Sequence, residues 1–392
     1  MHFVAGLSIE EQVGAAVDDL VAQIKTQSLK HKLEPRFDLA LAFMTPHFTY
    51  SVREISAALQ QRLNLDLIMG CTAESVLGTD REIEGQAGIS LVAAQMNEVQ
   101  RSPFILQSNN WPLMLLQPEE FARVVDAPPD AKLIILLGDP FTTPMDDVLH
   151  MFNQVYPSIP VVGGMASGAL RPYGNSLVMN DQVTDRGVIG VVLAGRLDVD
   201  VVVSQGCRPI WRPFKVEQAL KNKVYNLDGR APLAWLQDLI PELPESDRAL
   251  LQQGLFIGRA IHQDVDQLGR GDFLIRGVIG IDQQSGALSI GDQILEGEYI
   301  QFHLRDAETA REDLDMMLVP QAFRQPPAGA MLFTCNGRGR RLYDYPDGDI
   351  STIQRNLGGT PLAGFFCSGE IGPIGRVNFL HGHTASLILF RE

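Results

Sequence analysis

Hydrophobic residues along this chain change from helical spacing to strand-like runs in a regular order. Residues 9–27 carry Val13, Val17, Leu20 and Ile24 at the spacing of one helix face, which predicts an amphipathic helix that covers a sheet. The pattern then predicts a buried strand, a helix and a second short strand, at residues 37–44, 52–63 and 65–70. Strand–helix–strand units of this kind build sheets whose faces are covered by helices.

The same order of strand, helix and strand returns twice further along the chain. The second copy is predicted at residues 132–137, 145–156 and 159–162, and the third at 330–334, 350–356 and 362–366. The interval from Phe43 to Leu136 equals the interval from Gly70 to Gly163. Two landmarks at one spacing indicate an internal duplication. Each copy ends in a turn of glycine and small residues.

The segments that connect these copies are predicted to form antiparallel strands. Two hairpins are expected, from residues 186–194 with 199–204 and from 273–281 with 287–290, followed by a strand at 299–304 and a helix at 307–317. The predicted fold class is α/β, with two domains of mixed sheets covered by helices, in an αββα-like sandwich of repeated strand–helix–strand–hairpin units. The polar stretch 226–230 is the expected boundary, which gives an N-terminal helical extension (1–34) and domains at 35–226 and 227–392.

The composition limits the classes of partner. The 392 residues are 45% hydrophobic and 20% charged, which is typical of a packed globular protein. The formal net charge of −15 disfavours nucleic acid and anionic membranes as partners, because both require clustered positive charge. The longest apolar runs have the length of a strand, and the first residues lack the pattern of a signal peptide. We therefore expect no membrane insertion and a cytoplasmic location.

Five segments carry a resemblance to a known family. They read IMGCTA at 68–73, SQGCRPI at 204–210, VYNLDG at 224–229, FTCNGRG at 333–339 and GFFCSGEIGP at 364–373. In this order they resemble the FIST family, with its N-terminal and C-terminal FIST domains, over about residues 35–387. The resemblance implies an intracellular sensor of small ligands such as amino acids, without a cofactor. Because the chain has no room for an attached signalling domain, its output is expected to pass through the FIST domains themselves or a signalling partner.

The glycine-rich turns supply the candidate ligand-binding residues. Gly337 lets the backbone approach a ligand, Arg338 could hold a carboxylate with its planar fork, and Glu370 could accept an ammonium group. Both charged residues could instead be ordinary turn residues. The full candidate set is Cys71, Thr72, Gly164, Ser167, Cys335, Asn336, Gly337, Arg338, Cys367, Ser368, Gly369, Glu370 and His381. Such a set fits a small polar metabolite whose two charged ends need opposite partners.

Two alternatives remain open from the sequence. The first is a thiol-dependent hydrolase or transferase that uses Cys335 or Cys367, with His381 as the base and Glu370 orienting its imidazole. His381 and His383 lie two apart on a predicted strand, so they would face one side and could also bind a metal. Against an enzyme, the chain contains none of the P-loop, dinucleotide-binding, nucleophile-elbow or zincin motifs. The second alternative is a protein-interaction scaffold without a ligand.

Overall fold

The computed structural model describes residues 1–392 except 34–35, 263, 265–267, 270 and 392. The chain folds into two compact units. Unit 1 consists of Met1–Val203 and Leu314–Glu392, and unit 2 consists of Ser204–Asp313. Asn226, at the boundary expected from the sequence, lies within a strand of unit 2.

Unit 1 contains the three predicted strand–helix–strand copies, which we call repeats 1, 2 and 3. They are β2 (Phe37–Met44), α2 (Val52–Leu63) and β3 (Leu65–Thr72); β8 (Ala131–Gly138), α5 (Met145–Val155) and β9 (Val161–Met165); and β20 (Gly329–Cys335), α10 (Gly348–Leu357) and β21 (Leu362–Cys367). In each repeat the two strands pair in parallel. The predicted α/β fold class with mixed sheets is therefore confirmed.

Each parallel pair is the centre of a six-stranded mixed sheet with the same arrangement of neighbours. The first sheet has the order β1–β6–β2–β3–β10–β11, with β1 (His2–Ser8), β6 (Ile89–Gln95), β10 (Leu177–Met179) and β11 (Gln182–Thr184). The second has the order β7–β12–β8–β9–β22–β23, with β7 (Val99–Leu106), β12 (Val188–Gly195), β22 (Glu370–Ile374) and β23 (Val377–His381). The third has the order β13–β24–β20–β21–β4–β5, with β13 (Asp198–Gln205), β24 (Thr384–Arg391), β4 (Val76–Leu77) and β5 (Glu82–Ile83).

The last two strands of every sheet come from a different repeat. The hairpin β10–β11 follows repeat 2 along the chain but completes the first sheet, where Val178 pairs with Gly70. The hairpin β22–β23 follows repeat 3 and completes the second sheet. The hairpin β4–β5 follows repeat 1 and completes the third sheet. The exchange is therefore cyclic, and no repeat forms its sheet alone.

The hairpin β4–β5 also supplies a helix cap to repeat 3. The Glu82 carboxylate accepts hydrogen bonds from the backbone N–H groups of Asp349 (3.0 Å) and Ile350 (3.1 Å), in the first turn of α10. In return, the Glu82 N–H donates to the carboxylate of Asp347 at 2.7 Å. The Glu82 side chain thus satisfies two N–H groups of the first helical turn that have no partner within the helix. Repeat 1 thus stabilises the start of a helix in repeat 3.

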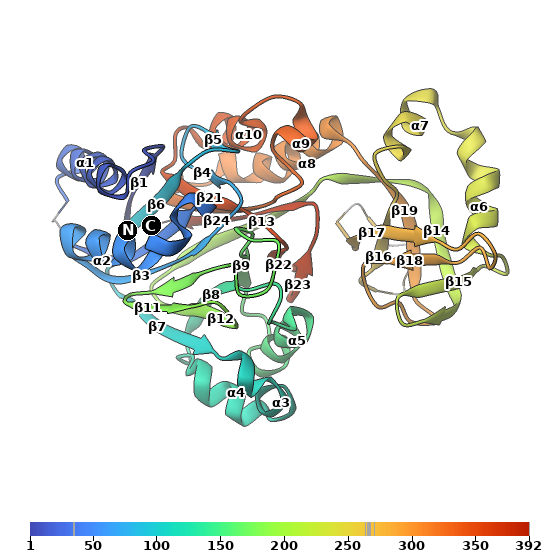
Figure 1. Ribbon diagram of the computed structural model, residues 1–392, viewed down its shortest axis with the longest axis horizontal. Helices are drawn as coiled ribbons and strands as arrows, with labels where there is room; N and C mark the ends of the chain where they lie inside the picture. The colour runs from blue at the N-terminus through green and yellow to red at the C-terminus, as the bar shows by residue number, and fades with distance from the viewer. Residues whose placement is uncertain (34–35, 263, 265–267, 270, 392) are drawn as a thin grey trace. The chain divides into compact units, whose positions relative to one another are not determined.

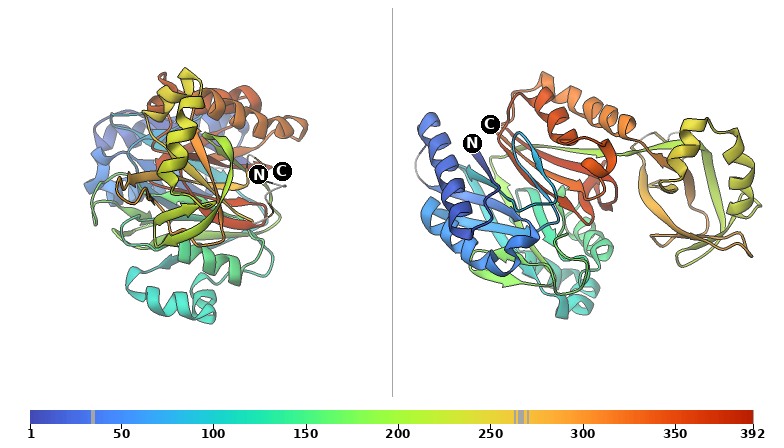
Figure 2. Two further views of the ribbon diagram at one scale, coloured as in Figure 1. Left: turned by 90° about the vertical axis from the view of Figure 1, so that its right-hand side faces the viewer. Right: turned by 45° about the horizontal axis from the view of Figure 1, so that its top comes forward.

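The alternation of side chains along the central strands divides the core of unit 1 into layers. On β2, Leu41 and Phe43 join a central core that also contains residues of the second and third sheets, whereas Ala42 and Met44 pack under the helices of repeat 1. The outer faces are covered by α1 (Val13–His31) and α2, by α3 (Trp111–Leu116), α4 (Pro118–Val125) and α5, and by α8 (Ala307–Leu318) and α10 (Figure 1, Figure 2). The three sheets therefore share one interior.

A glycine occupies the same structural position in each parallel pair. Gly70 pairs with Ala42, Gly163 with Leu136 and Gly364 with Leu332. A Cβ atom on any of the three glycines would lie 1.8 Å from the carbonyl oxygen of its partner. The spacing of Gly70 and Gly163 noted in the sequence reflects this shared position, whereas Leu136 corresponds to Ala42 rather than to Phe43.

Two sequence predictions about how the elements connect differ from the structure. The hairpin expected from residues 186–194 and 199–204 is wrong, because β12 and β13 lie in different sheets. Both edges of β12 are already paired, one with β7 and the other with β8. The chain also begins with a strand before the predicted helix, so the expected N-terminal extension contributes β1 to the first sheet.

Where its residues are described, unit 2 contains a closed six-stranded barrel accompanied by helices. The strands follow the order β14 (Cys207–Leu220), β15 (Lys223–Leu227), β18 (Leu288–Ile290), β17 (Phe273–Ile281), β16 (Phe256–Ala260) and β19 (Tyr299–Arg305), with α6 (Pro232–Leu239) and α7 (Glu245–Leu251). The predicted hairpin at 273–281 and 287–290 is confirmed by the pairing of Ile281 with Leu288. At the two ends of this unit, Ser204 Oγ and Gln205 N–H donate to the carboxylate of Asp313. Within the described ranges, no helix has both the length and the apolar composition needed to span a membrane.

Candidate functional site

The turns that end β3, β9, β20 and β21 meet inside unit 1. Hydrogen bonds join them in pairs: Ser167 N–H to Thr72 O (3.3 Å), Ser368 N–H to Met165 O (3.0 Å) and Asn336 N–H to Cys367 O (2.9 Å). Ser167 Oγ also donates to the carbonyl of Phe366 and accepts from the Glu74 N–H. We call this region the junction and define it as residues 71–74, 164–168, 335–338 and 367–370.

The junction brings together the candidate residues that the sequence placed on separate turns. Cys335 and Cys367 are register partners on neighbouring strands, and Glu370 is opposite Gly164. His381 is opposite Glu370 on the next strand, and its Nε2 lies 2.9 Å from the carbonyl oxygen of Gly372. His383, by contrast, lies in the turn before β24 with a φ of 64°. The prediction that the two histidines face one side of a single strand is therefore wrong.

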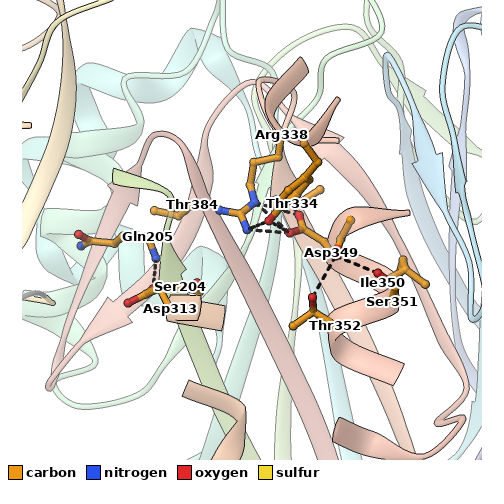
Figure 3. A network of polar contacts seen from close by, with 12 residues as sticks. Ser204, Gln205, Asp313, Thr334, Arg338, Asp349, Ile350, Ser351, Thr352 and Thr384 are labelled. Atoms are coloured by element: carbon orange, nitrogen blue, oxygen red, sulfur yellow. Dashed lines mark hydrogen bonds and ion pairs between the residues drawn. The ribbon is translucent and has the colours of Figure 1, made fainter. Parts of the chain in front are cut away.

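Arg338 is fully buried and forms an ion pair inside repeat 3. Its Nε lies 2.9 Å from Asp349 Oδ2, and its Nη2 lies 2.7 Å from Asp349 Oδ1. The Tyr343 hydroxyl accepts from Nη2 at 2.6 Å and lies 2.7 Å from Oδ1, while Thr334 Oγ1 donates to Oδ2 at 2.7 Å (Figure 3). Asp349 lies in the first turn of α10, and its side chain binds Arg338. Bidentate geometry of this kind favours a planar guanidinium.

Both members of this pair carry charge. Burial alone would lower the pKa of Arg338, but the nearby charge of Asp349 raises that pKa above its ordinary value. Burial alone would likewise raise the pKa of Asp349, and Arg338 with its hydrogen bonds lowers it below its ordinary value. A buried pair costs desolvation energy that only good geometry and further hydrogen bonds can offset. The bonds from Tyr343 and Thr334 supply that support.

One guanidinium nitrogen of Arg338 remains available. Nη1 is buried and has no hydrogen-bond partner within the part of the chain that the structure describes. In Figure 3, Thr384 lies on the side of the guanidinium away from Asp349. Thr384 binds the Glu370 carboxyl group, and the charge of Arg338 lowers the pKa of Glu370. The charge of Arg338 therefore acts on Glu370.

Glu370 is a fully buried acid at the start of β22. Its Oε2 accepts from the N–H (3.1 Å) and hydroxyl (3.0 Å) of Thr384, and the Cys335 thiol lies within hydrogen-bonding reach of the carboxyl group. Burial raises the pKa of Glu370 to about 8, although the hydrogen bonds from Thr384 and Cys335 lower it. The corresponding positions of the other two exchanged hairpins, opposite Cys71 and Phe365, hold Leu177 and Val76. A polar group here therefore departs from the repeat pattern.

The thiols of the junction differ in exposure. Cys71 and Cys367 are fully buried, and burial raises the pKa of each thiol above its ordinary value. Cys335 keeps 7% of its surface exposed, and the Gly337 N–H lies 3.4 Å from its Sγ. Solvent therefore reaches the junction at Cys335 before it reaches the other two cysteines.

The outer rim of the junction contains groups that the sequence analysis did not select. Arg341 forms an ion pair with Glu74, and its Nη1 donates to the carbonyl of Asn336 at 2.8 Å. Asn336 and Gly337 are half-buried, and Ser368 is exposed. Nothing in the local sequence pattern linked Glu74 to Arg341, because the two residues are far apart in the chain.

Two further observations concern cavities and possible metal ligands. Cavities of 290 to 540 Å³ on unit 1 are lined by residues outside the junction, for example around Arg186, Asp38 and Gln23. In the described ranges, no group of three His, Cys, Asp or Glu side chains is arranged to hold a metal ion. The chemistry of the junction is thus that of a buried donor, a buried acid and thiols.

We expect stability to fall as the pH rises from about 5 to about 8. Glu82 and Glu370 both have folded-state pKa values raised by burial to about 8, from an ordinary 4.5. Between these values the folded protein holds a proton that the unfolded chain releases, so each group favours folding below its unfolded pKa and loses that contribution as the pH rises. The slope is about 1.4 kcal/mol per pH unit and group.

Glu370→Gln, a neutral side chain of the same shape, should flatten this dependence. The measurement is urea unfolding of the parent and the variant at several pH values, where differences between the two isolate Glu370. Equal slopes for parent and variant would contradict the assignment.

Comparison with known proteins identifies the family of this chain. The model of the FIST N domain matches residues 38–230, and that of the FIST C domain matches residues 232–373. An uncharacterized protein of Mycobacterium bovis is 37% identical over 356 residues, which cover 90% of this chain and 90% of the relative. An uncharacterized protein of Mycobacterium tuberculosis is 36% identical over 356 residues, which cover 90% of this chain and 91% of the relative. This chain therefore belongs to the FIST family, whose domains generally serve as sensors in signal transduction.

Proposed function

We propose that this FIST protein binds a small polar metabolite, such as an amino acid, in the junction and signals through a partner protein. The observation that supports the proposal is the pairing of a buried, unsatisfied donor with a buried acid. Arg338 Nη1 has no partner among the described residues, and the nearby Glu370 stands where the other repeats have apolar residues. Buried polar groups without partners are costly, and a ligand that satisfies them recovers that cost.

The two groups suit the two ends of a zwitterion. Arg338 remains charged because Asp349 holds it, and its Nη1 would donate to a carboxylate. Glu370 is largely protonated at neutral pH, and an incoming ammonium group would favour its ionised form. The ligand would enter at the exposed side of the junction, past Ser368 and the half-buried Gly337.

Through the exchanged hairpins, a ligand bound in the junction would affect more than one repeat. Glu370 belongs to β22, which follows repeat 3 but pairs with β9 of repeat 2. The turn that holds Arg338 follows β20 of repeat 3, and Ser167 links the turns of repeats 1, 2 and 3 through its hydrogen bonds to Glu74 and Phe366. A ligand that orders the junction would therefore act on all three repeats, and a change in their packing is what a partner would recognise.

The proposal is tested by thermal-shift screening of the amino acids, followed by calorimetric titration of any that stabilise the protein. Glu370→Gln should weaken the binding of that amino acid about tenfold or more, since a hydrogen bond to a charged group contributes about 1.5–3 kcal/mol. Glu82→Gln is the matched control, because Glu82 is also buried with a raised pKa but caps α10. Its affinity should stay close to that of the parent.

Two results would contradict the proposal. One is a screen in which no amino acid shifts the melting temperature at millimolar concentration. The other is unchanged affinity in a folded Glu370→Gln variant, which would place the ligand away from the junction. Arg338→Lys serves as a second variant, because it keeps the positive charge while removing the fork.

A further inference from the structure

Two thiols of the junction lie side by side at the ends of neighbouring strands. Cys335 is the last residue of β20 and Cys367 is the last residue of β21, and the two are direct register partners in the parallel ladder. Phe333 and Phe365, two positions earlier on each strand, both belong to the central core. Because side chains two apart share a face of a strand, Cys335 and Cys367 project from the same side of the sheet.

The backbone spacing at this position suits a covalent link. Neighbouring strands lie about 4.7–4.9 Å apart, and the Cα atoms of a disulfide are usually about 4.4–6.8 Å apart. Joining the sulfurs also requires the Cβ atoms to approach slightly. Both cysteines end their strands and are followed by turns that contain Gly337 and Gly369, and glycine gives these turns a wider range of backbone conformations than other residues would.

In a redox-active dithiol, an oxidant attacks one thiol first, and the second thiol then attacks the oxidised sulfur. The burial of Cys335 and Cys367 differs as these two roles require. Cys335 is buried but keeps 7% of its surface accessible, whereas Cys367 keeps none, so a small oxidant meets Cys335 first. The Cys335 sulfur accepts from the Gly337 N–H at 3.4 Å and lies within hydrogen-bonding reach of the Glu370 carboxyl group, which can take the thiol proton. Cys367 is its register partner on the neighbouring strand, in position to attack the oxidised sulfur. Cys207 belongs to the barrel of unit 2 and serves as an internal reference.

We propose that Cys335 and Cys367 form a peroxide-reactive dithiol that closes to a disulfide between β20 and β21. Hydrogen peroxide transfers one oxygen to the Cys335 sulfur; the O–O bond breaks, an S–O bond forms, and one water leaves. The Cys367 sulfur then attacks the sulfenic acid, the S–O bond breaks, and the oxygen leaves as a second water with the thiol proton. The sum is two thiols and one peroxide converted to one disulfide and two waters. The proposal is independent of any metabolite.

The test uses the full-length protein, reduced and then freed of reductant. After treatment with hydrogen peroxide, mass spectrometry of a non-reducing digest should show the peptide pair that contains Cys335 and Cys367, and a dithiol reductant should remove it. In Cys367→Ser, the sulfenic acid on Cys335 should persist and be trapped by dimedone. In Cys335→Ser, both the disulfide and the trapped adduct should disappear, while Cys207→Ser should behave like the parent.

Alkylation of the untreated native protein supplies a measurement that needs no variant. Iodoacetamide should modify Cys335 at least about tenfold faster than Cys71, Cys207 or Cys367, in keeping with their exposure. A peroxide-treated parent in which Cys335 stays a free thiol would overturn the proposal. So would a disulfide that joins Cys335 to a cysteine other than Cys367, or one that forms only between two protein molecules.

Discussion

Replacing Gly70, Gly163 or Gly364 by alanine is expected to destabilise the protein by about 3 kcal/mol or more, and to leave little folded protein at 37 °C. An added Cβ atom would lie 1.8 Å from a backbone carbonyl oxygen in all three cases. A backbone atom cannot rotate away as a flexible side chain can, so the two central strands would have to separate. Each of these strands is buried on both faces, and the separation would disturb the central core and an outer core together.

Gly14→Ala is the matched control for these substitutions. Gly14 lies in α1, and a Cβ atom there meets no atom within 4 Å. Gly14 is the second residue of α1, where the advantage of alanine over glycine is smaller than the roughly 1 kcal/mol of a helix interior, so this variant should keep the stability of the parent or exceed it slightly. Urea unfolding measures all four variants. A Gly364→Ala protein within about 1 kcal/mol of the parent would show that the close approach is relieved without cost.

Residues 1–226 and 227–392, expressed separately, are expected not to fold. The first fragment would contain the hairpin β4–β5 without the third sheet that it completes. Its second sheet would lack β22–β23, and the central core would lose the residues of β20, β21 and β24. The cut at residue 226 also opens the barrel of unit 2 within β15. Each fragment would expose a large apolar surface, which leads to aggregation.

Co-expression of the two fragments is the control for this experiment. Because each fragment holds a hairpin that the other needs, the pair should assemble and purify together, with one cooperative unfolding transition. Two fragments that are each soluble, with separate cooperative transitions, would contradict the exchange and would favour independent domains divided at residue 226. Size-exclusion chromatography and thermal unfolding distinguish these outcomes.

The local elements were predictable because each carries its own hydrophobic period. The helix at 52–63 and the strand at 37–44 match the structure residue for residue, since one has a clear apolar face and the other is buried on both sides. The pairing of strands was not predictable in the same way. The failed hairpin at 186–204 has a plausible turn, but β12 finds its partners in β7 and β8, and nothing local records that preference.

The candidate site shows the same division between local and distant information. The sequence marked Arg338, Glu370 and the cysteines because they follow strands within glycine-containing turns, and the structure places them in one region. The groups that hold them came from elsewhere. Nothing in the local sequence connected Asp349 to Arg338 or Thr384 to Glu370. Those contacts form only when the strands and helices pack together in the tertiary structure.

The cyclic exchange of hairpins also sets an order of events during synthesis. The strand β4 leaves the ribosome early, yet its partner β21 is among the last segments to be made. Repeat 2 must likewise wait for β22, which follows repeat 3. Pairings between such distant segments are slow, because closing a long loop precedes any gain from contact. The nascent chain therefore carries unpaired strand edges until nearly all of it has emerged, and in the cell its completion depends on protection during that interval.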